Sequence, residues 1–229
     1  MRKSKIFFTL FYFLITAFSP IYALDTIAPT SQTVTLKRLF PFEKGYRWRY
    51  IHRTPEGESR ISGDYIGSVS KEGKEYYMLG NPYGVSYFEF TKDAIYHRAV
   101  APAQEPNAAS FYRDGDMIRL QMPLEKGNRW SNKGWLEVDG QARLIVSETE
   151  ILGWNRIEVP AGTYDCLVTS SSLNTLFLRK EMKAGLGSLA HELIWYAPDV
   201  GIVQRMKYLV YPGEPEEFLN EDKLEVFNK

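Results

Sequence analysis

FPFEKGYRW at residues 40–48 returns as MPLEKGNRW at residues 122–130. Both copies carry a proline, an apolar residue, Glu-Lys-Gly, one variable residue and then Arg-Trp. Glycine adopts positive φ angles at little cost, so Gly45 and Gly127 are well suited to a tight turn. The repeat predicts two similar halves, each of which begins with the same turn into a strand.

The first copy continues directly into an alternating segment. Over Tyr46–Arg53, Trp48, Tyr50 and His52 share one face, while the arginines between them lie on the other. A period of two with one aromatic face is typical of a half-buried antiparallel strand. Because Trp130 occupies the same place in the second copy, we expect Trp48 and Trp130 to be equivalent core residues.

Further short runs with strand character follow along the chain, separated by turn residues. The predicted strands are Arg60–Ser70, Lys74–Leu79, Val85–Thr91, Ala94–Ala99, Phe111–Arg113, Met117–Gln121, Arg129–Val138, Ala142–Glu148, Ile151–Val159, Thr163–Ser170, Thr175–Arg179, Leu189–Tyr196 and Ile202–Tyr211, with Lys223–Phe227 as an edge strand. Helical periodicity is weak, and Leu178–Ala184 is the best helical candidate.

Four turns connect these runs. Asp-Gly between strand-like segments is a strong hairpin signal, and it occurs at Asp114-Gly115 and Asp139-Gly140. Val159–Gly162 and Tyr196–Gly201 each combine a proline, which presets φ, with a glycine that suits the corner. Each of the four is therefore expected to join two neighbouring strands.

Short strands, frequent turns and an aromatic content of 14% indicate an all-β protein. We predict a curved antiparallel sheet, either a half-open barrel or a sandwich, built from two similar halves with little helix. It would form one domain over residues 38–229, with halves at about 38–99 and 111–211 and an acidic tail at 213–229. Neither half alone has enough residues to close a good core.

The N-terminus has the pattern of a secretory signal. Basic residues at positions 2–5 precede an uncharged apolar run at residues 6–18, and Ala23 offers a small residue for cleavage. The run is about 13 residues long, whereas a membrane-spanning helix needs roughly 20. We expect a signal peptide over residues 1–23, cleaved after Ala23, and the alternative is an uncleaved anchor. Residues 24–37, rich in Thr, Ser and Pro, should form a flexible lead-in.

Cys166 is the single cysteine of the chain, so no intrachain disulfide and no lipid anchor at the mature start are expected. It lies within an alternating strand, which predicts a buried, inert thiol. An exported protein of this kind fits the bacterial periplasm or the secreted fraction. The chain has 28 basic and 28 acidic residues, and cleavage of the signal peptide would remove basic residues but no acidic ones. The resulting negative charge argues against a nucleic-acid partner.

The sequence contains no nucleophile elbow, phosphate-binding loop or dinucleotide fingerprint. His191-Glu192 resembles the start of a zinc-binding H-E-x-x-H motif, but Trp195 stands where the second histidine is needed. His52, His97 and His191 lie in different predicted strands, and we expect packed or surface histidines. We therefore predict no catalytic, cofactor-binding or metal-ligating residues, no cofactor and no enzymatic activity.

Aromatic residues occur in most predicted strands, and they have two interpretations. They fill a core, which is the favoured reading, or they line a concave apolar cavity. The residues concerned are Trp48, Tyr50, Tyr76, Tyr77, Tyr87, Phe88, Tyr96, Trp130, Trp135, Trp154, Trp195 and Tyr196.

Four motifs in this order resemble a family of uncharacterised exported bacterial proteins and lipoproteins. They are the two Pro-x-Glu-Lys-Gly segments, the V-P-A-G-T-Y turn from Val159 and the Y-A-P-D-V-G-I-V turn from Tyr196, so the resemblance covers about residues 38–211. It implies a curved antiparallel sheet similar to lipoprotein-carrier folds. Many relatives have a lipid-anchoring cysteine at the mature start, which this chain lacks. The family carries no established activity or catalytic residues.

Three functions follow as hypotheses. The leading one is a non-enzymatic exported envelope protein that binds an apolar small molecule or another envelope protein, with membrane association left open. The second is a carrier or chaperone of lipidated cargo, which requires a cavity. The third is a hydrolase without a recognisable motif, which requires a histidine near a nucleophile or a carboxylate in a cleft.

Overall fold

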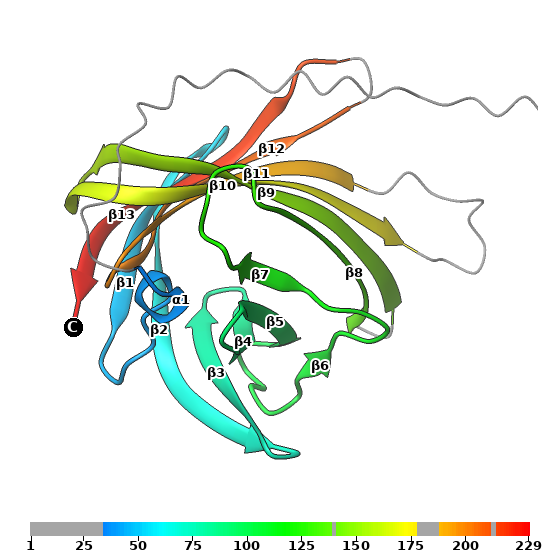
Figure 1. Ribbon diagram of the computed structural model, residues 1–229. Coiled ribbons are helices and arrows are strands. Elements are labelled where there is room, and N and C mark those ends of the chain that lie inside the picture. The colour runs from blue at the N-terminus through cyan, green and yellow to red at the C-terminus, as the bar shows by residue number, and fades with distance from the viewer. Residues whose placement is uncertain (1–33, 139–140, 178–187, 212–213) are drawn as a thin grey trace, which may run out of the picture.

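The computed structural model describes residues 34–138, 141–177, 188–211 and 214–229, and it consists almost entirely of β-strands (Figure 1). The strands are β1 (Arg47–Thr54), β2 (Gly57–Lys71), β3 (Lys74–Asn81), β4 (Gly84–Phe90), β5 (Ala94–Ala101), β6 (Ser110–Phe111), β7 (Ile118–Gln121), β8 (Arg129–Val138), β9 (Gln141–Val159), β10 (Gly162–Phe177), β11 (Ser188–Ala197), β12 (Gly201–Leu209) and β13 (Glu217–Asn228). One short helix, α1 (Leu36–Leu39), is present in the described residues. The prediction of an all-β curved sheet with little helix is confirmed.

All strands belong to one antiparallel sheet in the order β6-β5-β4-β3-β2-β1-β13-β12-β11-β10-β9-β8, with β7 paired to β5. Two meanders, β1–β6 and β8–β13, are thus joined by the pairing of β1 with β13. The sheet curls until its two ends nearly meet (Figure 1). Arg113 and Trp135 exchange two backbone hydrogen bonds of 2.8 Å across this seam.

β13 is central and not an edge strand, which corrects the prediction for Lys223–Phe227. It pairs with β1 on one side and β12 on the other, and it extends over most of the expected acidic tail. Its acidic side chains are partnered across the sheet: the Glu225 carboxylate accepts from the Arg49 guanidinium at 2.7 Å and from the Arg60 guanidinium at 3.1 Å. The Glu225 charge, which suggests a solvated tail, is therefore neutralised by arginines of β1 and β2.

The second meander contains two long strands where the sequence predicted four shorter ones. β9 runs without a break through Thr149-Glu150, and β10 runs through the polar stretch 171–174. The two strands pair with each other along their length, with one register shift near Val168. Gly153, at φ 119°, lies beside this shift. Pairing on both sides keeps the polar residues in β-structure, so the predicted breaks are wrong.

The hairpin expected at Asp114-Gly115 does not form. β6 and β7 both pair with β5 and not with each other. Gly115 instead approaches the seam so closely that a Cβ there would lie 1.7 Å from the Lys133 carbonyl oxygen. Gly115 therefore allows two backbones to lie in close contact and does not form a two-residue hairpin turn. The hairpin pairing of β8 with β9 is observed, although Asp139-Gly140 itself lies outside the described residues.

Helix α1 closes one end of the curved sheet, and its Leu36 and Leu39 are buried. The last two residues of the lead-in expected over residues 24–37 belong to α1, and residues 24–33 lie outside the described residues. The Arg38 guanidinium donates to the Asp199 carboxylate at 2.9 Å, which fastens α1 to the β11–β12 turn. The predicted signal peptide and the helical candidate Leu178–Ala184 lie outside the described residues. No helix among the described residues is long and apolar enough to cross a membrane.

The two copies of the repeated segment form the same turn. In each, the amide after the glycine donates to the carbonyl of the preceding glutamate, at 3.0 Å in the first copy and 3.1 Å in the second. Gly45 has φ 98° and Gly127 has φ 86°, so the positive φ predicted from the sequence is confirmed. Trp48 and Trp130 follow on β1 and β8, and both are buried.

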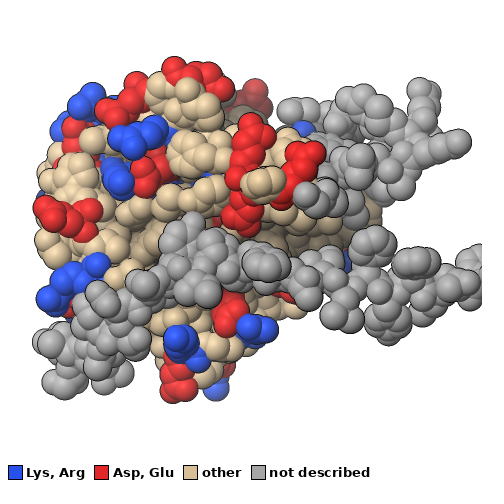
Figure 2. Space-filling view, turned by 90° about the horizontal axis from the view of Figure 1, so that it is seen from above, with Lys and Arg blue, Asp and Glu red and all other residues tan. Residues whose placement is uncertain are grey.

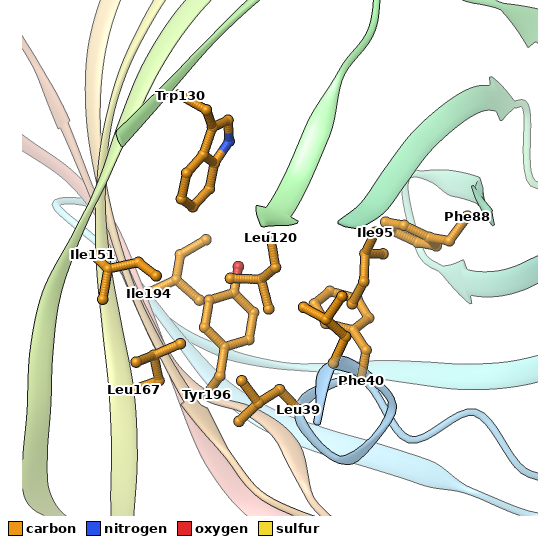
Figure 3. Packing of buried hydrophobic residues seen from close by; sticks show 11 residues of the cluster. Leu39, Phe40, Phe88, Ile95, Leu120, Trp130, Ile151, Leu167, Ile194 and Tyr196 are labelled. Atoms are coloured by element: carbon orange, nitrogen blue, oxygen red, sulfur yellow. The ribbon is translucent and has the colours of Figure 1, made fainter. Parts of the chain in front are cut away.

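The concave side of the sheet is filled by a central core (Figure 3). Leu39 and Phe40 enter it from the α1 side, while Leu120, Ile194 and Tyr196 come from strands on different sides of the curl. A second core, here called the hairpin core, lies beneath the β9–β10 hairpin, whose Ala161 amide donates to the Leu224 carbonyl on β13 at 3.1 Å. The large aromatic residues thus mainly fill cores, as the favoured reading predicted.

Candidate functional site

A pocket of about 240 Å³ remains beside α1, between the start of the first meander and β12. Its lining is mostly apolar and includes a small set of polar side chains. It is lined by Phe40, Pro41, Phe42, Trp48, Tyr50, Ile61, Ser62, Gly63, Leu79, Asn81, Tyr83, Gly201, Ile202, Arg205 and Asp222.

Hydrogen bonds fix the aromatic walls of this pocket. The Trp48 indole N–H donates to the Val200 carbonyl at 2.6 Å, and the Tyr50 hydroxyl donates to the Ile202 carbonyl at 3.0 Å. Gly201 lies next to the Trp48 ring at φ 94°, where a Cβ would be 3.6 Å from the indole nitrogen. Contacts between β1 and the β11–β12 turn therefore shape the pocket. The sequence predicted this segment as a turn but gave no sign that it borders a pocket.

Asp222 is a charged residue of the pocket lining, and its side chain is only 3% exposed. One carboxylate oxygen accepts from the His52 imidazole at 2.6 Å, and the other accepts from the Arg205 guanidinium at 2.8 Å. Burial lowers the pKa of Arg205, but the carboxylates of Glu192 and Asp222 raise it further than burial lowers it. Arg205 is therefore charged, and it forms an ion pair with Asp222 in the largely apolar lining of the pocket.

Further charges lie near this ion pair, around Glu192 on β11, whose carboxylate interacts with Arg205. Its carboxylate is 3.2 Å from the Arg119 guanidinium and 3.7 Å from the Lys207 ammonium. Burial raises the pKa of Glu192, yet Arg119, Lys207 and Arg205 lower it to about 2. This buried network ties β7, β11 and β12 together across the concave side.

His97 is a packed histidine, as expected. Its ring stacks on Phe88 with centroids 5.1 Å apart and meets Tyr112 edge-on at 5.4 Å. Burial lowers the pKa of His97 to about 4, so the imidazole is neutral at physiological pH.

His191 has a more specific environment than the sequence predicted. Its Nε2 lies 2.8 Å from the Ser170 hydroxyl oxygen, and its Nδ1 lies 3.1 Å from the Glu216 carboxylate. Glu192, the next residue, pairs with Arg119 and Lys207 instead. Adjacent strand residues point to opposite faces, which explains why His191-Glu192 forms no joint site.

No local pattern in the sequence signals this cluster, because its members are 21 and 25 residues apart from the histidine. Strand pairing alone brings Ser170 on β10 next to His191 on β11, and the segment before β13 adds Glu216. Among the described residues, no group of three or more His, Cys, Asp or Glu side chains is arranged to hold a metal ion.

Two solved structures share this fold. A protein of Bacteroides fragilis, proposed to be exported and described as having a YmcC-like fold, is 15% identical, with 82% of this chain and 98% of that chain covered and a TM-score of 0.54. A proposed lipoprotein of Parabacteroides distasonis is 14% identical, with 86% of this chain and 100% of that chain covered and a TM-score of 0.57. At such identities the similarity concerns the fold alone. No protein-family model and no curated protein matches the chain.

Proposed function

We propose that the protein binds a small, largely apolar ligand in the pocket beside α1, within the bacterial cell envelope. The observation that carries this proposal is the pocket itself, whose lining combines aromatic and aliphatic side chains with the Arg205–Asp222 pair. Ligand sites are typically concave and apolar, with a few well-placed polar groups that orient the ligand.

The size of the pocket limits what it can hold. At about 240 Å³ it is smaller than the usual range of roughly 300–1,000 Å³ for drug-sized ligands. It suits one small aromatic molecule or the end of one acyl chain. Its apolar walls would cover that part, while a polar group on the ligand could reach Arg205 and Asp222.

The packing of the concave side weakens the alternative of a carrier for lipidated cargo. Such a carrier needs an apolar cavity for the acyl chains of its cargo, but α1 and the central core occupy the concave side. Leu39, Leu120 and Tyr196 are fully buried there, and the pocket beside α1 has a volume of only about 240 Å³. The architecture therefore favours a small ligand over a multi-chain lipid.

The charge distribution argues against a nucleic-acid partner. Basic and acidic side chains are present in equal number in the whole chain. They lie interspersed on the face seen in Figure 2, without a continuous basic stripe. Nucleic-acid binding depends on such a stripe, so a nucleic-acid partner is disfavoured.

Export is part of the proposal. It is supported by the signal-like N-terminus and by the shared fold with proteins that are described as exported or as lipoproteins. N-terminal sequencing of protein from the envelope fraction should begin at Leu24. Recovery of intact Met1 in the membrane fraction would replace this with an anchored form.

Binding can be tested with an anilinonaphthalene dye, which fluoresces when it enters an apolar pocket. Ile61 on β2 lines the pocket, so Ile61→Trp should fill it and weaken dye binding by about tenfold or more. Ile66→Trp is the matched control, because Ile66 lies on the same strand, is 48% exposed and does not line the pocket. Equal binding by both variants, at unchanged melting temperature, would contradict the proposal.

A further inference from the structure

Ser170, His191 and Glu216 form a linear chain of contacts outside the pocket. The Ser170 oxygen lies 2.8 Å from His191 Nε2, and His191 Nδ1 lies 3.1 Å and 3.3 Å from the two Glu216 oxygens. An activated nucleophile needs this arrangement: a base within about 2.6–3.2 Å of the hydroxyl, and a third group that orients the base.

The carboxylate fixes the position of the imidazole proton. An ionised carboxylate can only accept hydrogen bonds, so Nδ1 must carry the proton that faces Glu216. Nε2 of the neutral ring is then an acceptor, and the Ser170 hydroxyl donates to it. This is the protonation state in which histidine can remove the serine proton.

The cluster is partly shielded from water and borders apolar side chains. The side chains of His191 and Glu216 are 16% and 29% exposed. The His191 ring lies 6.2 Å from the Tyr208 ring, and Leu193, two residues along β11, is buried in the hairpin core. Partial burial strengthens the carboxylate–imidazole contact, while an open side still allows a reagent to approach.

The backbone around Ser170 offers few hydrogen-bond donors that could stabilise a developing oxyanion. β10 pairs with β9 and with β11 at this position, so its amides are directed to the neighbouring strands. Removing an oxyanion donor from a serine hydrolase costs about 10²–10³ in rate. Substrates with an intrinsically good leaving group depend least on such donors.

We propose that Ser170 is an activated nucleophile that accepts acyl groups from activated esters, such as aryl esters or thioesters. The Ser170 oxygen attacks the ester carbonyl carbon while its proton passes to His191 Nε2. The bond from that carbon to the leaving oxygen or sulfur breaks, and the leaving group takes the proton from His191. Water, deprotonated by the same nitrogen, then cleaves the acyl-serine to a carboxylic acid and restores the hydroxyl. This site is separate from the ligand pocket.

The test uses the full-length protein, a fluorophosphonate probe and 4-nitrophenyl acetate. Intact-mass spectrometry should find one phosphonylated serine per chain, and the ester should give a stoichiometric burst of nitrophenol followed by slow turnover. Ser170→Ala and His191→Gln should abolish both signals. Glu216→Gln should slow them about tenfold or more, because the imidazole loses its orienting partner.

Ser172→Ala is the matched control. Ser172 lies on the same strand and directly opposite His191 in the register, but the imidazole nitrogen is bonded to Ser170. This variant should react like the wild type, and melting curves should show that all variants are folded. Absence of any adduct on the wild-type protein, or an adduct that persists in Ser170→Ala, would overturn the proposal.

Discussion

Trp130→Ala is expected to be one of the most destabilising single substitutions in the chain. The side chain is only 6% exposed and packs in the central core beside the seam (Figure 3). Truncation of a buried tryptophan to alanine costs about 3–5 kcal/mol, since transfer energy is lost and a cavity remains. The indole N–H also donates to the Ile118 carbonyl at 3.1 Å, which ties β8 to β7. Against a total stability of about 5–15 kcal/mol, this loss is severe.

Trp130→Phe separates the hydrogen bond from the packing. The Ile118 carbonyl keeps a second donor, the Asn132 amide at 3.0 Å, so it does not become an unsatisfied buried acceptor. The phenylalanine variant should therefore lose only about 1–2 kcal/mol. Urea denaturation of both variants gives the two values, and Trp130→Ala should melt about 10 °C lower than the wild type. A Trp130→Ala variant that loses less than about 1 kcal/mol would refute the packing argument.

Three further outcomes follow from other positions. The pKa of His97 is lowered to about 4, so the unfolded chain takes up a proton below pH about 6.5 before the folded chain does. The free energy of unfolding should therefore fall by up to about 3 kcal/mol as pH drops from about 6.5 to about 4. In urea titrations, His97→Phe should abolish that fall. Burial raises the pKa of the Cys166 thiol, so a maleimide should not label the native protein, and rapid labelling would contradict the burial of this residue. Cys166→Ser should cost about 1–3 kcal/mol in thermal melts, because it places a hydroxyl in an apolar site. Gly115→Ala would place a Cβ against the Lys133 carbonyl and should speed hydrogen exchange at the seam, whereas unchanged exchange would mean that the backbones are not in close contact.

The sequence predicted the fold class and most strands because alternation and turn residues act locally. The turn at Gly45 and its counterpart at Gly127 are examples, since positive φ at a glycine needs no tertiary information. β13 was misassigned because its charges suggest a solvent-exposed tail. Arg49 and Arg60, which neutralise Glu225, lie far away in the chain.

The sites were harder to predict than the fold. The pocket draws its walls from the segment after α1, from the first meander and from β12, so no sequence window contains it. Ser170 and His191 come together only through the register of β10 and β11. Such contacts depend on the pairing order of the strands, which hydrophobic periodicity does not encode.

Native mass spectrometry of protein purified from its own cell envelope tests the ligand proposal most directly. The wild-type protein and the Ile66→Trp control should each carry one additional small mass, and Ile61→Trp should lack it because its pocket is filled. A wild-type protein without any bound mass, or an Ile61→Trp variant that carries the same mass, would contradict a ligand in the pocket beside α1.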